Sequence, residues 1–278
     1  KKITIILIAY KSEKLINDFV KKIPNSIKVI IIENSNNLLL KRKIEKKYKN
    51  IKVYIKTNEG VGASINYGAK KIQTKYFLQI SPDIIFNYKD LDIYLDIAKE
   101  LNDKFAGIGP RFLKVKKKSH KQIKKNLEIG LIESIHGSCM FINKKRFNEI
   151  GGFDKKIFLY FEETEYCKRA LSKGLKSYQT NKIKVKRHGR SVLVKNKKEK
   201  NRLDNICIWH FIWSKYYYTK KHYGIIISLI IFFPILVRIL FKIIYHSVIQ
   251  NKSIKEKYKY RLSGLITAIR GKKSSLRF

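Results

Sequence analysis

Short apolar runs alternate with amphipathic segments over residues 3–80 of this 278-residue chain. Each apolar run is rich in β-branched residues, and apolar positions at helical spacing follow it. The runs expected to form strands are Ile3–Ala9, Ile27–Ile32, Ile51–Lys56 and Tyr76–Ile80, and the helices between them are Lys11–Ile23, Leu38–Tyr48 and Val61–Ile72. Apolar strands that are separated by helices form βαβ units, so the sequence predicts a parallel sheet with helices on both faces.

Right-handed crossovers bring the carboxyl ends of such strands to one edge of the sheet, where ligands bind. A glycine-rich segment, Asn58–Gly68, lies between the third strand and the following helix. Its glycines allow backbone N–H groups to approach a ligand, and a helix N-terminus favours an anion such as a diphosphate. The spacing matches neither the dinucleotide fingerprint nor the P-loop, and a simple tight turn is the alternative interpretation.

The pattern after Asp83 is less regular. The expected elements are a helix at Leu91–Leu101, strands at Gly107–Leu113 and Ser138–Ile142, and helices at Lys144–Ile150 and Glu162–Lys173, with Lys114–Asn126 as a basic loop. We therefore place one α/β domain at residues 1–205, with halves at about 1–105 and 106–205, and a helical region at 206–278.

The helical region contains an uncharged stretch, Ile225–Val237, that is shorter than the roughly 20 residues needed to cross a bilayer. Extending it to Tyr245 adds Arg238 and Lys242, which share one helix face with Pro234 because these residues are four apart. A helix in the membrane interface or a re-entrant helix fits this stripe better than a simple span, although a spanning helix and a buried helix are alternatives.

A second apolar stripe between Ile254 and Ile269 is flanked by lysines and arginines. A basic amphipathic helix of this kind is typical of membrane-surface binding, and a helix that packs on its own domain is the alternative.

The net charge of the chain indicates a negatively charged partner. Lys and Arg number 62 against 21 Asp and Glu, which gives a net charge of +41. Residues 181–278 contain 24 of the basic residues and only 3 acidic ones, so half of the excess lies in this last third. A hydrophobic content of 44% excludes a disordered basic tail. Phosphate ligands, nucleic acid and an anionic membrane remain as candidate partners.

Two further features of the sequence indicate the cellular compartment of the protein. Three cysteines without paired spacing exclude a disulfide framework and a cysteine-rich zinc site, and they predict free thiols in a reducing compartment. The segment that opens with Lys1 and Lys2 shows no signal-peptide pattern, in line with that expectation.

Scarce polar residues that follow strands are the candidates for chemistry. Asp83 ends the fourth strand after Pro82, where a free carboxylate can hold a divalent metal that bridges phosphate oxygens or can cap the next turn. His188 can act as a metal ligand through a neutral imidazole, and a structural histidine is the alternative.

Three carboxylates, Glu162, Glu163 and Glu165, occur within four residues beside an aromatic run. Because close carboxylates repel and an apolar setting raises the pKa, one of them is suited to be a general base. The favourable position of acids at a helix N-terminus is the structural alternative.

Six segments in this order resemble the family 2 glycosyltransferases with a GT-A fold, especially the bacterial rhamnosyltransferase-like branch. The matching segments are Ile5–Ser12, Ile30–Ser35, Asn58–Gly68, Ser81–Asp83, Gly137–Met140 and Gly151–Arg169. The resemblance implies a Rossmann-like nucleotide-sugar-binding α/β fold with a mostly parallel sheet. It also implies an inverting transfer of a sugar, rhamnose or another deoxyhexose, from a nucleotide-diphosphate donor to a hydroxyl of a cell-surface glycan or lipid-linked glycan precursor.

The resemblance further implies a role for each matching residue. The base and ribose of the donor would be held by Ala9, Tyr10 and Glu33, and its diphosphate would be lined by Asn58, Gly60, Asn66 and Ser81. Asp83 would bind a divalent metal, Mg²⁺ or Mn²⁺, with His188 as a second contact. Glu163, or less favourably Glu162, would be the catalytic base, and Gly137 and Ser138 would lie near the acceptor.

Three residues depart from the family's pattern. Glu33 stands where Asp is usual, Glu162-Glu163 stands where Glu-Asp is frequent, and Ser81 replaces the first acid of Asp-x-Asp. Metal binding would therefore depend on Asp83 as the one acid of that motif.

The expected partners are a nucleotide-diphosphate sugar, a glycan or polyprenyl-linked glycan acceptor and an anionic membrane, with no nucleic acid. The expected location is the cytoplasmic face of the inner (plasma) membrane, as a peripheral or monotopic protein. Two alternatives are a catalytically silent, membrane-bound glycan-binding or scaffold protein and a basic nucleic-acid-binding protein, which the charge and 12% aromatic residues permit.

Overall fold

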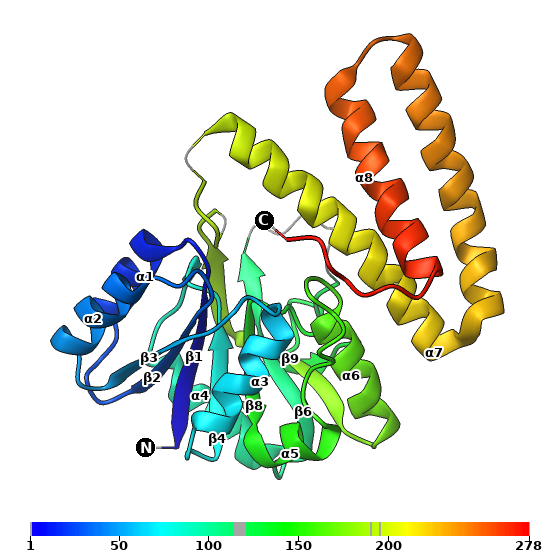
Figure 1. Cartoon of the computed structure of the whole chain (residues 1–278). Helices are drawn as coiled ribbons and strands as arrows, with labels where there is room; N and C mark the ends of the chain where they lie inside the picture. Colours follow the sequence, from blue (N-terminus) through cyan, green and yellow to red (C-terminus); the bar gives the residue numbers. More distant parts are fainter. Residues whose placement is uncertain (1, 114–120, 190, 195, 278) are drawn as a thin grey trace. The chain divides into compact units, whose positions relative to one another are not determined.

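The structure is a computed structural model that describes the chain except residues 1, 114–120, 190, 195 and 278. It contains two compact units (Figure 1). The α/β unit comprises Lys1–Asp154 and Glu163–Leu193, and the helical unit comprises Lys155–Glu162 and Val194–Phe278. The expected domain boundary at residue 205 falls inside a helix, and the division between the units lies between Leu193 and Val194.

The first half of the sheet is parallel, in the order β3-β2-β1-β4. These strands are β1 (Ile3–Ala9), β2 (Lys28–Glu33), β3 (Ile51–Ile55) and β4 (Tyr76–Ile80). Each lies where the apolar runs predicted it, to within one residue. Their carboxyl ends meet at one edge, as expected of βαβ units.

The second half of the sheet is mixed. Its strands are β5 (Ile84–Ile85), β6 (Phe105–Leu113), β7 (Ile129–Leu131), β8 (Cys139–Asn143) and β9 (Lys176–Arg187). β8 pairs antiparallel with both β4 and β6, whereas β9 runs parallel to β6 and antiparallel to β5 and β7. The expected sheet is thus entirely parallel over the strands of residues 3–80, and it becomes mixed over the later strands.

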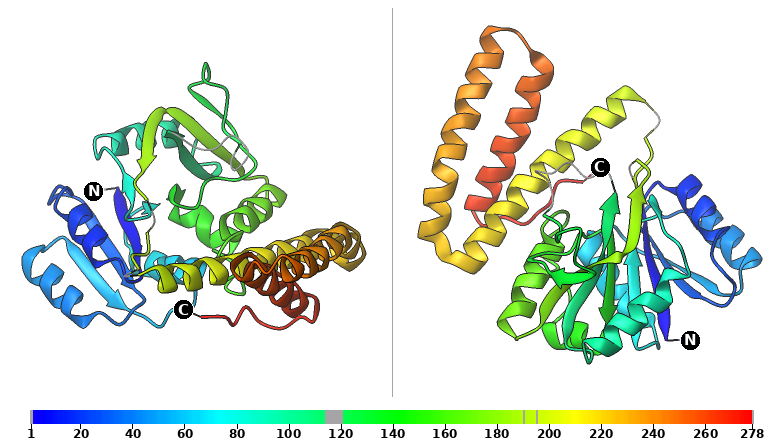
Figure 2. Two further views of the ribbon diagram at one scale, coloured as in Figure 1. Left: turned by 90° about the horizontal axis from the view of Figure 1, so that it is seen from above. Right: turned by 180° about the vertical axis from the view of Figure 1, so that it is seen from behind.

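Helices cover both faces of the sheet (Figures 1 and 2). The core on one face includes residues of α1 (Glu13–Val20), α2 (Leu38–Lys47) and α4 (Asp90–Glu100), and the core on the other includes residues of α3 (Val61–Lys71), α5 (Lys144–Ile150) and α6 (Glu162–Ser172). Alternate residues of β1 divide between these cores, with Ile5 and Leu7 in the first and Ile6 in the second. The period of two in strand side chains explains why its run is apolar throughout.

The helical unit contains two long helices, α7 (Lys197–Val248) and α8 (Lys252–Ile269). Non-helical backbone at Gly224 (φ 85°, ψ 171°) divides α7 into two straight parts, a conformation that glycine adopts without a Cβ clash. α8 returns along α7 and buries Leu265 with Phe232 and Ile239 (Figure 2). Gly264 permits the close approach, because a Cβ there would lie 2.6 Å from the Trp209 carbonyl oxygen.

His210 joins three segments of the helical unit. Its Nδ1 lies 2.8 Å from Ser274 Oγ, its Nε2 lies 2.8 Å from the Leu276 carbonyl oxygen, and its ring stacks on Phe158. Burial lowers the pKa of His210 to about 4, so the imidazole is neutral at physiological pH. Phe158 belongs to the segment 155–162, which is therefore packed on α7 although it immediately precedes α6.

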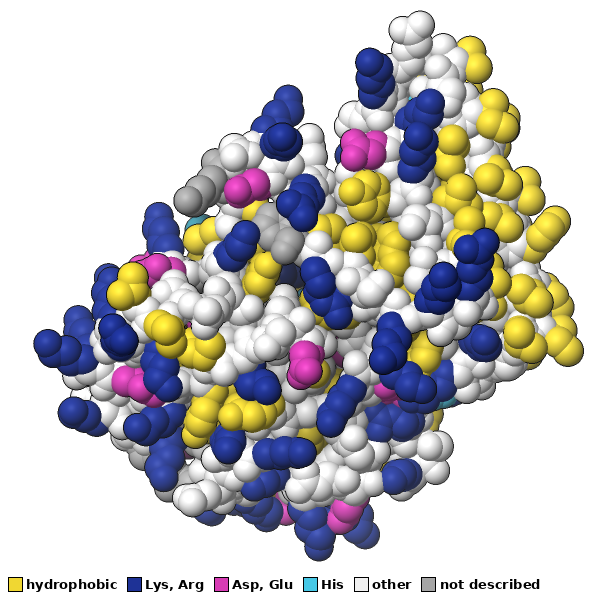
Figure 3. Space-filling model, viewed as in Figure 1, with side chains coloured by type: hydrophobic (Ala, Val, Ile, Leu, Met, Phe, Trp, Pro, Cys, Tyr) yellow, Lys and Arg dark blue, Asp and Glu magenta, His cyan; other side chains and the backbone are white. Residues whose placement is uncertain are grey.

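The part of α7 that follows Gly224 exposes a continuous apolar surface, which Figure 3 shows along this helix. We call it the apolar face; its residues include Ile226, Ile230, Phe233, Phe241, Ile244 and Val248. By length and composition alone, α7 is the one described helix that is long and apolar enough to cross a membrane. Arg238 is exposed, Lys242 is half-buried and His246 is buried against α8, so the expected polar stripe is only partly at the surface.

Candidate functional site

The glycine segment after β3 forms an open helix N-terminus. Gly60 is the N-cap of α3 with φ 105°, where any other residue would be strained, and no side chain caps the helix there. Asn58 Oδ1 accepts a hydrogen bond from the Gly60 amide at 3.3 Å, which shapes the turn. The first amides of α3 therefore lie at the sheet edge where an anion would be favoured.

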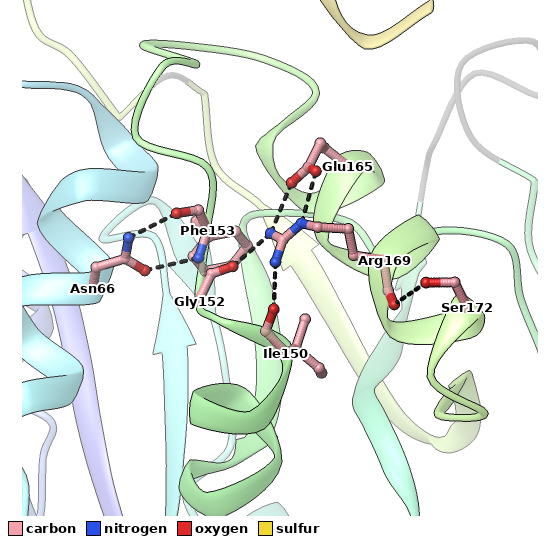
Figure 4. A network of polar contacts seen from close by, with 7 residues as sticks. All are labelled: Asn66, Ile150, Gly152, Phe153, Glu165, Arg169 and Ser172. Atoms are coloured by element: carbon pink, nitrogen blue, oxygen red, sulfur yellow. Dashed lines mark hydrogen bonds and ion pairs between the residues drawn. The ribbon is translucent and has the colours of Figure 1, made fainter. Parts of the chain in front are cut away.

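Asn66 fastens two halves of the α/β unit together (Figure 4). Its side-chain Nδ2 donates to the carbonyl of Phe153 at 2.8 Å, and its Oδ1 accepts from the amide of the same residue at 2.8 Å. Both polar atoms are thus engaged with the loop that joins α5 to α6. These contacts tie α3 to this loop, and a contact of Asn66 with the donor diphosphate remains a prediction.

Arg169 holds the same loop from the other side (Figure 4). Its guanidinium makes two bonds to the Glu165 carboxylate, of 2.7 and 2.8 Å, and donates to the carbonyls of Ile150 and Gly152 at 2.6 Å each. Glu165 is fully buried. One of the three clustered acids is therefore held in a buried ion pair with Arg169, a structural role that differs from the expected helix N-terminal one.

Residues at the ends of β1 and β2 are mostly buried or hydrogen-bonded to the loops that follow these strands. Ala9 is buried, and Tyr10 is half-buried and donates its amide to Ser12 Oγ. The buried Glu33 carboxylate accepts from the Ser35 amide and hydroxyl and, at 2.7 Å, from the Asn37 amide. Contact of these residues with a base and ribose remains a prediction.

Asn34, which the sequence analysis did not single out, connects β2 to the glycine segment. Its Nδ2 donates to Ser64 Oγ at 2.8 Å, and that hydroxyl donates to the Gly60 carbonyl. The Oδ1 atom of Asn34 is buried and has no hydrogen-bond partner within the described residues. Its position directly after Glu33 was the only available signal.

Asp83 lies between β4 and β5, and its side chain has no exposed surface. Arg187 donates from Nε to Asp83 Oδ2 at 2.6 Å, and the His188 amide donates to the Asp83 carbonyl at 2.7 Å. The pairing of β5 with β9 fixes both contacts, since Ile84 stands opposite Arg187. The structure thus brings the Asp83 and His188 backbones together and adds Arg187, which sequence reasoning missed. A metal contact by the His188 imidazole remains a prediction.

The residues at Asp83 fit a divalent cation. Asp83 Oδ1 is buried and has no hydrogen-bond partner among the described residues, so it is a carboxylate oxygen whose missing partner a cation could supply. The His188 side chain is exposed one residue beyond Arg187. Within the described residues no three His, Cys, Asp or Glu side chains cluster as a metal cage, so water and ligand oxygens would complete the shell.

The segment Gly137–Ser138, which was expected near the acceptor, contacts both the Asp83 loop and α6. The Ser81 amide donates to the Ser138 carbonyl at 2.8 Å, and Gly137 lies against the side chain of Glu163. Burial raises the pKa of Glu163 to about 7. Glu162 is also buried, at the first position of α6. The geometry therefore puts Glu163 beside the expected acceptor segment.

His136, for which the sequence indicated no metal-ligand role, precedes this segment directly. Its Nδ1 lies 2.6 Å from Ser138 Oγ, and its ring stacks on Phe112 at 4.3 Å between centroids. Adjacency to Gly137 was the signal that could have identified it.

The candidate site thus combines an open helix N-terminus, a buried acid after β4 and a partly buried carboxylate on α6. Solved structures of similar fold are GT-A glycosyltransferases. One is a Pyrobaculum calidifontis mannosyltransferase solved with GDP-Man and Mn²⁺, which the chain matches at a TM-score of 0.61 and 8% identity. The match covers 98% of this chain and 88% of that one. Staphylococcus aureus TarS, residues 1–349, solved with UDP-GlcNAc, matches at 0.56 and 13% identity, covering 98% and 93%. The fold is thus GT-A.

The model of glycosyl transferase family 2 matches residues 4–167, and the chain belongs to this family. It is 26% identical over 197 residues to the low-salt glycan biosynthesis hexosyltransferase Agl10 of Haloferax volcanii, covering 62% of each chain. It is 29% identical over 171 residues to the dTDP-rhamnosyl transferase RfbF of Shigella flexneri, covering 53% of this chain and 55% of that protein. The chain spans less than two thirds of the length of both relatives.

Proposed function

We propose that the protein is an inverting glycosyltransferase that moves one sugar from a nucleotide-diphosphate donor to a hydroxyl of a glycan or lipid-linked glycan precursor. The observation that carries the proposal is the continuity of the site. The segment of Asp83 is hydrogen-bonded to Ser138 through Ser81, and the adjacent Gly137 lies against Glu163. Asp83 and a carboxylate with a pKa of about 7 are thus connected through adjacent, contacting segments.

The acceptor and the departing diphosphate are served by different groups. Glu163 accepts the proton of the acceptor hydroxyl while the hydroxyl oxygen attacks C1 of the sugar from the face opposite the leaving group. General-base catalysis of this kind typically raises the rate 10²–10⁴-fold. The α3 N-terminus at Gly60 offsets the charge that develops on the departing diphosphate. Mg²⁺ or Mn²⁺ would be held by Asp83 Oδ1 and His188 and would neutralise part of the same charge. The mannosyltransferase and GalNAc-T7 structures, which contain Mn²⁺, support this assignment.

The names of the relatives suggest which sugar the donor carries. RfbF is named a dTDP-rhamnosyl transferase and Agl10 a hexosyltransferase, so we propose rhamnose or another deoxyhexose as the sugar. The experiment is a screen of dTDP-, UDP- and GDP-sugars with Mg²⁺ or Mn²⁺, in which the released nucleoside diphosphate is measured for the wild type and Glu163→Gln. Donor binding without turnover across a panel of acceptors would instead favour a catalytically silent glycan-binding protein.

We propose that the helical unit attaches the enzyme to the cytoplasmic face of the plasma membrane, near a lipid-linked acceptor. The apolar face of α7 supports attachment, and exposed basic residues such as Lys252, Lys259 and Arg261 on α8 supply the charge. Each juxtamembrane Lys or Arg contributes about 1 kcal/mol toward anionic lipid. The same surface fits a peripheral or monotopic protein.

A further inference from the structure

We propose that Arg187 is a cation built into the donor diphosphate site, which binds phosphate oxygens directly and maintains nucleotide binding without a metal. The inference rests on the proposed function, because it assumes that a nucleoside diphosphate binds beside Asp83. It is carried by the contact of Arg187 Nε with Asp83 Oδ2 at 2.6 Å.

The position of Arg187 is fixed by backbone pairing. Arg187 is the last residue of β9 and stands opposite Ile84 in the β5–β9 ladder, and the next amide, that of His188, bonds to the Asp83 carbonyl. Since the backbone on both sides of the ion pair is held, the guanidinium is preorganised at the carboxyl end of β4.

The contact leaves most of the guanidinium available. A guanidinium has five N–H donors, and Arg187 uses only the one on Nε toward any residue in the described ranges. Its side chain is 43% exposed, whereas that of Asp83 has no exposed surface. The remaining donors therefore suit the two-pronged contact that arginine makes with a phosphate.

Electrostatics favour the same role. An unpaired buried Asp83 would repel a diphosphate, which carries the same sign of charge. Pairing with Arg187 cancels that repulsion and leaves only Oδ1 without a partner among the described residues. A metal at Asp83 would then use Oδ1, so Arg187 and the metal would act on the diphosphate from different atoms of one carboxylate.

The test is calorimetric binding of UDP, dTDP and GDP, in EDTA and in Mn²⁺, by the full chain. We expect the wild type to bind at least one of them in EDTA. We expect Arg187→Gln to weaken that metal-free affinity by about tenfold, the size of one charge-assisted contact. Lys186→Gln is the matched control, because it removes the same charge one residue earlier in β9, where the side chain faces the opposite side of the sheet. It should leave the affinity unchanged.

Removal of Arg187 leaves a buried charge at Asp83, so thermal melting must accompany the binding measurement. The double variant Asp83→Asn, Arg187→Gln removes both charges and should show the same loss in EDTA while it folds. Equal metal-free affinity in the wild type and the Arg187 variants, or wild-type binding only with Mn²⁺, would overturn the inference and leave the proposed function standing. Absence of nucleotide binding under both conditions would overturn the proposed function itself.

Discussion

Gly137 lies so close to Glu163 that an added Cβ would stand 3.2 Å from both Cδ and Oε2 of the carboxylate. The glycine is therefore the surface against which the proposed base rests. A methyl group there would displace the carboxylate by a few tenths of an ångström.

We expect Gly137→Ala to fold normally and to lower kcat by about tenfold, because small displacements of a reacting group are costly in rate. Donor turnover and thermal melting measure the two effects. In a Glu163→Gln background the same alanine should have no further effect on kcat, since its target is already removed. An equal loss of kcat in the wild-type and Glu163→Gln backgrounds would show that Gly137→Ala does not act through Glu163.

The pH profile should report the Glu163 carboxylate. Because its pKa lies at about 7 and the base must be ionised, kcat/KM should rise tenfold per pH unit below that value and level off above it. Glu163→Gln should lose 10²–10⁴-fold in kcat and its residual rate should not follow this profile. A near wild-type rate would transfer the role of base to Glu162 or to another group.

The same carboxylate should affect stability with a defined sign. The folded-state pKa of Glu163, about 7, exceeds the ordinary glutamate value of 4.5, so the folded state holds the proton more tightly than the unfolded state. Wild-type stability should therefore decline as the pH rises from about 4.5 to about 7. Glu163→Gln removes this penalty, and above pH 7 it should raise the free energy of unfolding by about 1–3 kcal/mol.

Urea unfolding at low and high pH would measure this difference. The exposed acid Glu133 provides the control, since Glu133→Gln should change stability little at either pH. A destabilised Glu163→Gln at high pH would contradict the predicted sign.

Arg169 should be far more important for stability than an exposed ion pair. Arg169→Gln leaves the buried Glu165 carboxylate without its partner and frees the carbonyls of Ile150 and Gly152. We expect the free energy of unfolding to fall by about 3 kcal/mol or more. Lys99→Gln, which breaks the exposed pair with Asp96, should cost less than about 1 kcal/mol.

The strands of residues 3–80 were predictable from local pattern, whereas β9 was not. β1 and β4 are buried on both faces and read as continuous apolar runs. β9 buries only part of a polar, lysine-rich sequence, and its burial follows from pairing with β6 rather than from its own composition.

The site shows the same limit. Asp83 was identifiable because it follows an apolar strand, but its contact with Arg187 spans 104 residues and depends on the β5–β9 pairing. Likewise, spacing alone did not distinguish Glu163 from Glu165. Two positions apart on a helix, they face different ways, and Glu165 meets Arg169 one turn later.

The apolar face of α7 should determine attachment to vesicles. Ile230 and Phe233 are each 67% exposed, so burial of either in the acyl boundary would contribute about 1.5–3 kcal/mol. We expect Phe233→Glu to reduce co-sedimentation with phosphatidylglycerol vesicles by tenfold or more, because it removes the apolar contact and adds a charge that anionic lipid repels. Leu171→Glu places the same charge at an exposed leucine of α6 in the α/β unit and serves as the control. If both variants bind vesicles as the wild type does, the apolar face is not the membrane contact; if Phe233→Glu alone is released, and donor turnover in solution is preserved, attachment and catalysis reside in separate units of the chain.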